Sequence, residues 1–216
     1  MFALIESGSI TKYLNGNKGI TLGDTQYPRA IYTLWSEAER NAIGIYEIVY
    51  DNTNRKDEKW YINTSQSYAY DASAGTVTAT YGSATDKAHA DTLYTQDEEN
   101  ADVYPDGHDD AGDRIGTWSA GDVKEPGLKT NLIITVKLQA AVELSNTDWY
   151  ITRNAEKSTA IPSAITTHRD LVRSRQASME TSITNASNTP ALETLYTYTT
   201  DSDGVTSRPL AEIPTL

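Results

Sequence analysis

Five side chains that could bind a hard cation cluster in the loop "DGHDDAGD". They are Asp106, His108, Asp109, Asp110 and Asp113. Carboxylate oxygens are the ligands that Ca²⁺ and Mg²⁺ prefer. The spacing differs from the EF-hand pattern, because no alternating ligands precede the turn glycine and no glutamate stands at the far position. We therefore interpret the loop as a solvated acidic connector and predict that it holds no essential metal.

The other candidates for catalysis lack partners at a useful spacing. Asp148 needs a second acid or a base within reach to work by acid–base chemistry, and Glu156 lies about two helical turns further along. His89, His108 and His168 stand in unrelated contexts, and none forms the HExxH or HxH arrangement of a zinc site. No GxSxG nucleophile elbow, phosphate-binding glycine loop or dinucleotide fingerprint is present. The sequence therefore predicts no enzyme and no cofactor.

The composition argues against several classes of partner. With 18 Lys and Arg against 30 Asp and Glu, the formal net charge is -12. Such a chain repels a phosphate backbone on average, so we expect no nucleic-acid partner. The absence of cysteine excludes a disulfide framework, a thiolate metal site and a cysteine nucleophile. The start "MFALIESGSI" has an acid in place of basic charge and a short apolar run, so we expect neither a secretory signal nor a membrane partner.

Short alternating runs predict a small β-rich docking domain over residues 1–84. Phe2–Glu6 and Ser9–Tyr13 flank a Ser-Gly pair, whose glycine suits the tight turn of a hairpin. Further strands are predicted at "IYEIVY", "WYIN", "SYAY" and "TVTATY". The stretch "SEAE" at Ser36–Glu39 has the form of a capping box and predicts one short helix that ends near Gly44.

The rest of the chain divides into an acidic connector, a helical module and a terminal hairpin with an extended tail. The connector, 85–123, carries most of the excess acid and is predicted to be a loop or extended segment. The helical module, 124–195, contains predicted helices at Asp148–Glu156 and Pro162–Ile183. Before them, "PGLKTNLIITVKLQAAVEL" fits a helix or a strand by pattern alone. Residues 196–216 read as a hairpin and a tail interrupted by prolines, which makes the fold class α+β.

Several apolar residues of the C-terminal half are candidates for packing or interaction. Thr147 is expected to cap a helix, and Trp149 is expected to be its buried anchor. Ile165, Val172 and Met179 recur every seven residues, a narrow stripe that predicts packing on a partner. The tail adds three apolar residues that have no following element to cover them: Leu210, Ile213 and Leu216.

The segment "LSNTDWYITRNAEKSTAIPSAITTHRDLVRSR" resembles a helical module found at the C-terminus of small bacteriophage tail-associated structural proteins, of the tail, baseplate or tail-fibre adaptor type. In that module an apolar helix leads to "TDW", then to "R", "AE" and "IP", and finally to a basic helix. The stretches "FALIESGSITKY", "YPRAIYTLWSEAERNAIGIYEI" and "YAYDASAGTVTATY" are similar to the small β-rich domain that often precedes it. The resemblance implies a helix for Leu128–Leu144 and carries over no catalytic residue.

From this resemblance we expect a virion structural protein of the distal phage tail, made in the host bacterial cytoplasm. It would act through contacts with other tail or fibre proteins and as a homo-oligomer, with a trimer favoured. A tail-fibre assembly chaperone would share these features but would leave after assembly. A further alternative is a tail module that binds or hydrolyses host glycans with the acidic loop and exposed aromatic residues, although the sequence presents no recognisable pair of acids.

Overall fold

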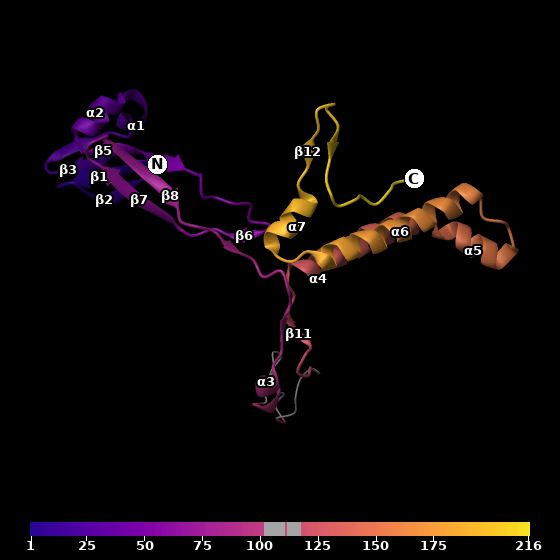
Figure 1. The fold of residues 1–216 in the computed structure, drawn as a ribbon. Coiled ribbons are helices and arrows are strands. Elements are labelled where there is room, and N and C mark those ends of the chain that lie inside the picture. Colours follow the sequence, from indigo (N-terminus) through magenta and orange to yellow (C-terminus); the bar gives the residue numbers. More distant parts are fainter. Residues whose placement is uncertain (102–110, 112–117) are drawn as a thin grey trace. The chain divides into compact units, whose positions relative to one another are not determined.

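Alternating apolar residues organise the first unit, Met1–Thr85, around a mixed five-stranded sheet (Figure 1). In the computed structural model, which describes residues 1–101, 111 and 118–216, the second unit is Asp86–Leu216. The larger sheet lies in the first unit and the long helices lie in the second. The predicted α+β class is therefore confirmed.

The sheet of the first unit is assembled from β1 (Phe2–Glu6), β2 (Ser9–Leu14), β5 (Ile45–Asp51), β7 (Gln66–Asp71) and β8 (Thr76–Tyr81). Its strand order is β2-β1-β5-β8-β7, and the β5–β8 pair is parallel while the other pairs are antiparallel. The predicted opening hairpin is confirmed. Its turn residues, Ser7 and Gly8, both have positive φ, 53° and 80°, as a two-residue hairpin turn requires.

Strand alternation gives this sheet two apolar clusters. The neighbours Ala3 and Leu4 belong to different clusters, because successive side chains of a strand point to opposite faces. Helix α1 (Ile31–Leu34) contributes to the cluster around Leu4. The buried members of that cluster are Leu4, Leu14, Ile20, Ile31, Tyr32 and Ile45, and those of the other are Ala3, Ile48, Val77 and Ala79.

Tyrosine rings extend the second cluster toward solvent. The hydroxyl of Tyr70 donates to that of Tyr46 at 3.2 Å, and their ring centroids lie 5.0 Å apart. This hydrogen bond raises the pKa of Tyr46 above its usual value. The rings of Tyr13 and Tyr68 lie 4.8 Å apart, so the tyrosines pack on one another across the strands.

Four short strands lie outside the five-stranded sheet. They are β3 (Ile20–Leu22), β4 (Thr25–Tyr27), β6 (Tyr61–Ile62) and β9 (Thr85–Asp86). β3 and β4 form a hairpin of their own.

The predicted capping box begins helix α2 (Glu37–Ala42). The backbone N–H of Ser36 donates to Glu39 Oε2 at 2.7 Å, and the backbone N–H of Glu39 donates to Ser36 Oγ at 3.3 Å. Gly44, with φ of 78°, then turns the chain into β5. Ile5 N–H donates to its carbonyl at 2.8 Å, and a Cβ at Gly44 would lie only 2.7 Å from the Ile5 oxygen. Glycine is required here by both the backbone angle and the space.

We expect Gly44→Ala to lower the free energy of unfolding of the first unit more than Gly75→Ala does. Both positions have positive φ, which costs a residue with a Cβ about 1–2 kcal/mol. Gly75 has open space around it, whereas a Cβ at Gly44 would meet backbone. The difference should be about 1 kcal/mol or more, measured by chemical denaturation, and equal losses would contradict this account of the turn.

The second unit begins with a short arm that contains β10 (Thr92–Leu93), α3 (Gln96–Asn100) and β11 (Val123–Glu125). β10 pairs with β11, and the rings of Tyr94 and Trp118 stack with centroids 4.0 Å apart. The described parts of 85–123 are mostly irregular or extended, as predicted, but they also contain the helix α3, which the prediction missed. The acidic composition drew attention away from an aromatic pair and a capping sequence, both of which stabilise this arm.

A second capping box begins helix α3. Thr95 N–H donates to Glu98 Oε2 at 2.9 Å, and Glu98 N–H donates to Thr95 Oγ1 at 3.2 Å. Lys124 Nζ donates to the other oxygen of the Glu98 carboxylate. The Lys124 bond, followed by the bond from Thr95, lowers the pKa of Glu98 to about 2. The stabilisation by this ionised group is complete above the ordinary glutamate pKa and is lost as the pH falls through about 2.

Helices build the remainder of the second unit. α5 (Asp148–Lys157) and α6 (Ser163–Asn185) confirm the two predicted helices, and α4 (Leu128–Ser145) shows that the ambiguous segment is a helix. α4 and α6 lie side by side along their length (Figure 1). After them come α7 (Thr189–Tyr196) and the predicted terminal hairpin, formed by β12 (Thr199–Thr200) and β13 (Thr206–Ser207).

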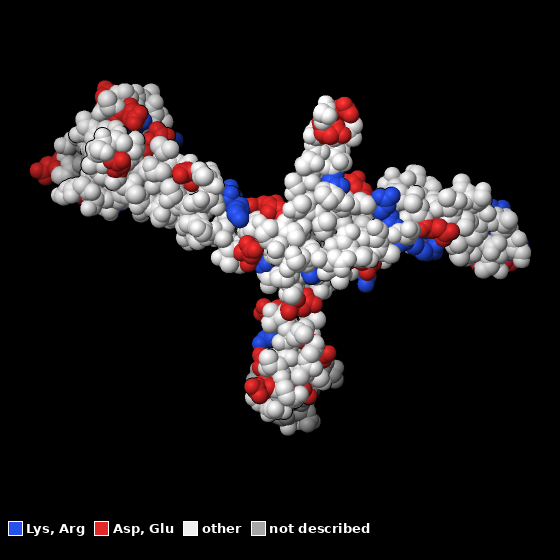
Figure 2. All heavy atoms as spheres, viewed as in Figure 1, with Lys and Arg blue, Asp and Glu red and all other residues white. Residues whose placement is uncertain are grey.

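Acidic side chains are spread over both units, in keeping with the net charge of -12. Figure 2 shows one group of them at the tip of the β12–β13 hairpin. There Asp201 Oδ1 accepts from the backbone N–H groups of Asp203 and Val205 at 2.9 Å each. None of the helices in the described part of the chain combines the length and apolar character that a membrane span needs.

Candidate functional site

The stripe of Ile165, Val172 and Met179 is buried inside the chain itself. The sequence predicted that this stripe would pack on a partner, and the structure corrects that prediction. α4, whose helical state the pattern left open, supplies the facing surface through Leu132, Val136 and Ala140. The stripe is therefore a core seam between α4 and α6 and is not available to another molecule.

Arg169 of α6 connects the ends of two other helices from within this seam. Its Nη1 donates to the Leu144 carbonyl at 2.8 Å and to Thr147 Oγ1 at 2.6 Å, and it lies 2.9 Å from Asp148 Oδ1. The Leu144 carbonyl belongs to the last turn of α4, where carbonyls lack helical partners and a cation is favourable. The "TD" of "TDW" and the arginine of "HRD" thus form one contact, which we call the Arg169 clamp.

Thr147 stands at the predicted N-cap position of α5, but the clamp explains why its side chain does not cap the helix. The side chain of Thr147 makes no capping bond to α5, and its hydroxyl donates to the Leu144 carbonyl at 2.9 Å. The hydroxyl oxygen accepts from Arg169 at the same time. Thr147 is buried, so its side chain serves the junction of α4 and α6 instead of the start of α5.

A second polar contact beside the clamp involves Glu143 and His168. His168 Nε2 lies 2.9 Å from Glu143 Oε1, and both side chains are largely buried between α4 and α6. The same Glu143 oxygen accepts from the backbone N–H of Leu216 at 2.9 Å. The end of the chain is thereby held on α4. Sequence reasoning missed this set because its members are far apart along the chain.

Trp149 is not the buried anchor that the sequence predicted. Its side chain is 51% exposed, and α5 as a whole buries no residue. The ring packs on Tyr150, with centroids 3.7 Å apart, and the Arg153 guanidinium lies 6.0 Å from its centre. Thr147 takes the buried position next to Arg169, and the tryptophan turns outward.

The tail lies partly on its own chain, contrary to the prediction that no element would cover it. Leu210 is buried, and its N–H donates to the Leu195 carbonyl at 2.9 Å. Ile213 is half-buried, and Leu216 is exposed. Ile213 and its neighbours form one wall of a groove whose other wall is α4: Thr135, Leu138, Gln139, Val142 and Glu143 face Arg208, Glu212, Ile213 and Thr215.

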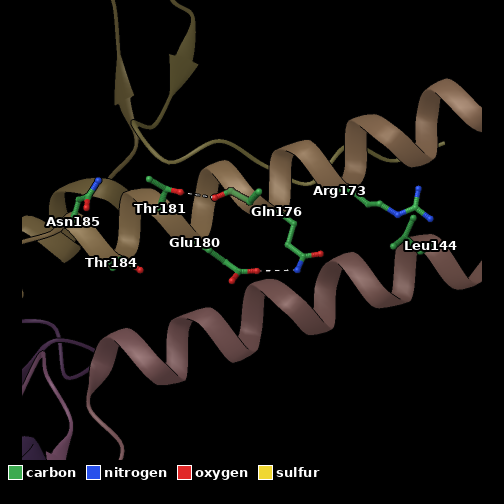
Figure 3. Close-up of a pocket in the computed structure, with 8 residues that line it drawn as sticks. Leu144, Arg173, Gln176, Glu180, Thr181, Thr184 and Asn185 are labelled. Atoms are coloured by element: carbon green, nitrogen blue, oxygen red, sulfur yellow. Dashed lines mark hydrogen bonds between the residues drawn. The ribbon is translucent and has the colours of Figure 1, made fainter.

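A second groove, beside α4 and α6, is lined mainly by polar side chains that bond to groups of the protein (Figure 3). Gln176 Nε2 donates to Glu180 Oε1 at 2.8 Å, and Thr181 Oγ1 donates to the Ala177 carbonyl at 2.9 Å. Glu180 is the one acid among the eight residues that line this groove. Glycoside hydrolysis commonly uses two carboxylates, and this groove does not supply the pair.

The solvent-facing side of α4 carries a row of apolar residues, which sequence reasoning also missed. Ile134, Leu138 and Val142 follow one another at intervals of four and are 48%, 62% and 66% exposed. The only charged residues of α4 are Lys129, Lys137 and Glu143, and the structure describes the whole helix. We call the surface formed by Ile134, Leu138, Ala141, Val142 and Ser145 the outer face of α4. Rows of apolar side chains that stay exposed are candidates for protein contacts.

The acidic loop that was considered for cation binding, and for which no essential metal is predicted, lies outside the described residues except for Ala111. Asp106, His108, Asp109, Asp110 and Asp113 lie outside the described residues. Within residues 1–101, 111 and 118–216, no group of three or more His, Asp or Glu side chains could hold a metal ion.

Comparison of the chain with protein-family models, curated proteins and solved structures finds no match.

We expect Arg169→Met to lower the free energy of unfolding of the second unit by about 2–3 kcal/mol. The methionine keeps apolar bulk but removes the guanidinium that donates to the Leu144 carbonyl and to the buried Thr147 hydroxyl and that pairs with Asp148. The Leu144 carbonyl then keeps its bonds from Thr147. Chemical denaturation measures the loss. The matched control is Arg173→Met, which removes an exposed ion pair with Asp170 and should change stability by no more than about 0.5 kcal/mol. Similar effects of the two substitutions would count against the clamp.

We expect Trp149→Ala to lower the free energy of unfolding by less than about 1 kcal/mol, because half of the side chain is already in water. Met179→Ala, which opens a cavity in the buried seam, should cost about 2–5 kcal/mol. Thermal unfolding of the two variants tests the assignment. A larger loss for Trp149→Ala would restore the anchor role that the sequence suggested.

Proposed function

We propose that the chain is a structural protein of the distal tail of a bacteriophage, in the baseplate, the tail tip or a fibre adaptor. It acts by protein–protein contacts with other tail or fibre proteins and with copies of itself. Catalysis, cofactors, nucleic acid and membrane play no part in this proposal. The resemblance of the segment around "TDWYITRNAEKSTAIP" to tail-associated modules names the setting.

The outer face of α4 is the observation that carries the proposal. Charged residues make up 22% of the chain, yet Ile134, Leu138 and Val142 form a largely exposed apolar row on α4. The contact of these side chains with water is unfavourable. Such surfaces mark sites of protein association. The Arg169 clamp supports the same interpretation, because the polar residues of the "TDW" region bind Arg169 and hold the helices together.

Quantitative mass spectrometry of purified phage particles tests this role. A structural protein should be present at a fixed ratio to the other tail proteins, in every preparation and after further purification. Absence, or an amount far below that ratio, would favour the tail-fibre assembly chaperone. Turnover of host surface polysaccharide by the purified chain would overturn the non-enzymatic role.

A further inference from the structure

We propose that the outer face of α4 is covered by α4 of further copies of this chain, packed parallel around a common axis, with a trimer favoured. This assigns the self-association of the proposed function to one surface and one orientation. Only the location of the oligomer in the phage tail rests on the proposed function.

The width of the outer face favours more than one neighbour. Successive residues of a helix are about 100° apart, so Ile134 and Val142 lie about 80° apart around α4, with Leu138 between them. A two-helix seam needs only a narrow stripe. Ala141 and Ser145 fall on the same side and add small residues that permit close approach. Each helix can then contact two neighbours at once.

The two edges of this face carry opposite accessible charge. On one edge, Lys137 has a side chain that is 57% exposed, and its partner Glu180, 3.7 Å away, is less exposed. On the other edge, the tail places Glu212 beside the groove with a side chain that is 61% exposed, and its partner Arg208, 3.6 Å away, is the less exposed member. The more exposed member of the ion pair is therefore positive on one edge and negative on the other, where Glu212 also accepts from the Tyr198 hydroxyl.

The orientation follows from these edges. In a parallel cyclic arrangement the Lys137 edge of one copy meets the Glu212 edge of the next, as opposite flanking charges do in parallel coiled coils. In an antiparallel pair, the Lys137 edge of one copy meets the Lys137 edge of the other, and the two Glu212 edges likewise meet. Lys137 directly precedes Leu138, the centre of the apolar row, so an antiparallel pair centred there would bring two lysines together. Charge thus favours the parallel arrangement.

Disulfide trapping tests the orientation, and the chain is suited to it because it has no cysteine. Ile134→Cys and Val142→Cys are made separately in the full-length chain and oxidised at the highest soluble concentration. The two positions are about 12 Å apart along α4, and a disulfide needs Cα atoms within about 7 Å. Each variant alone should form a covalent pair. Leu171→Cys, exposed on α6, is the control and should remain largely uncrosslinked.

Three results would overturn the proposal. Covalent pairs that form only when the two variants are mixed would show an antiparallel arrangement. No pairs from either variant would show that copies of the chain do not cover this face, and crosslinking of the Leu171→Cys control to the same extent would show random collision. None of these outcomes bears on the presence of the chain in the virion, which mass spectrometry of particles decides separately.

Charge exchange tests the edges independently, with association measured by sedimentation equilibrium. Leu138→Glu should weaken association by roughly a hundredfold, because it places a charge in the apolar contact. Lys137→Glu and Glu212→Lys should each weaken it by up to about tenfold. The double variant should recover most of the loss, since the edges are again opposite in sign. Additive losses in the double variant would contradict the pairing of edges.

Discussion

The buried guanidinium of Arg169 is the contact on which the helical unit depends. A charge taken out of water must be met by good acceptors, and three converge on one nitrogen from the end of α4, from the connection to α5 and from the start of α5. Few arrangements of α4, α5 and α6 satisfy that requirement. The clamp therefore specifies the junction of the three helices, while the apolar seam between α4 and α6 supplies most of the stabilisation.

Once the clamp and the seam place α4 on α6, the two sides of α4 have different roles. Leu132, Val136 and Ala140 face the seam, and Ile134, Leu138 and Val142 are left facing outward. Glu143 binds both His168 and the backbone of Leu216, so the tail is held along the same helix. The groove between α4 and the tail, and the charged edges of the outer face, are consequences of that placement.

Local patterns predicted most of the elements, because each depends on a few neighbouring residues. The hairpin at Ser7-Gly8, the capping box at Ser36–Glu39 and the helices α5 and α6 are of this kind. Contacts between distant segments were not predictable in the same way. The period of seven correctly identified Ile165, Val172 and Met179 as a packing stripe, but it could not tell that the partner was α4 of the same chain. Trp149 was misjudged because hydrophobicity alone says nothing about which way the first turn of α5 faces.

One signal for the interaction surface was present in the sequence. Leu128, Leu132 and Val136 suit a helix face, while "NLIITV" is β-branched enough for a strand, so the pattern was ambiguous. Once the segment is known to be a helix, Ile134, Leu138 and Val142 fall on a second, exposed side, which indicates a second contact surface. A cryo-electron map of the assembled oligomer or of the particle tests this central claim most directly. We expect α4 helices of neighbouring copies to run parallel around an axis with Leu138 at their contact, and a map that leaves Leu138 in solvent on an isolated copy would contradict it.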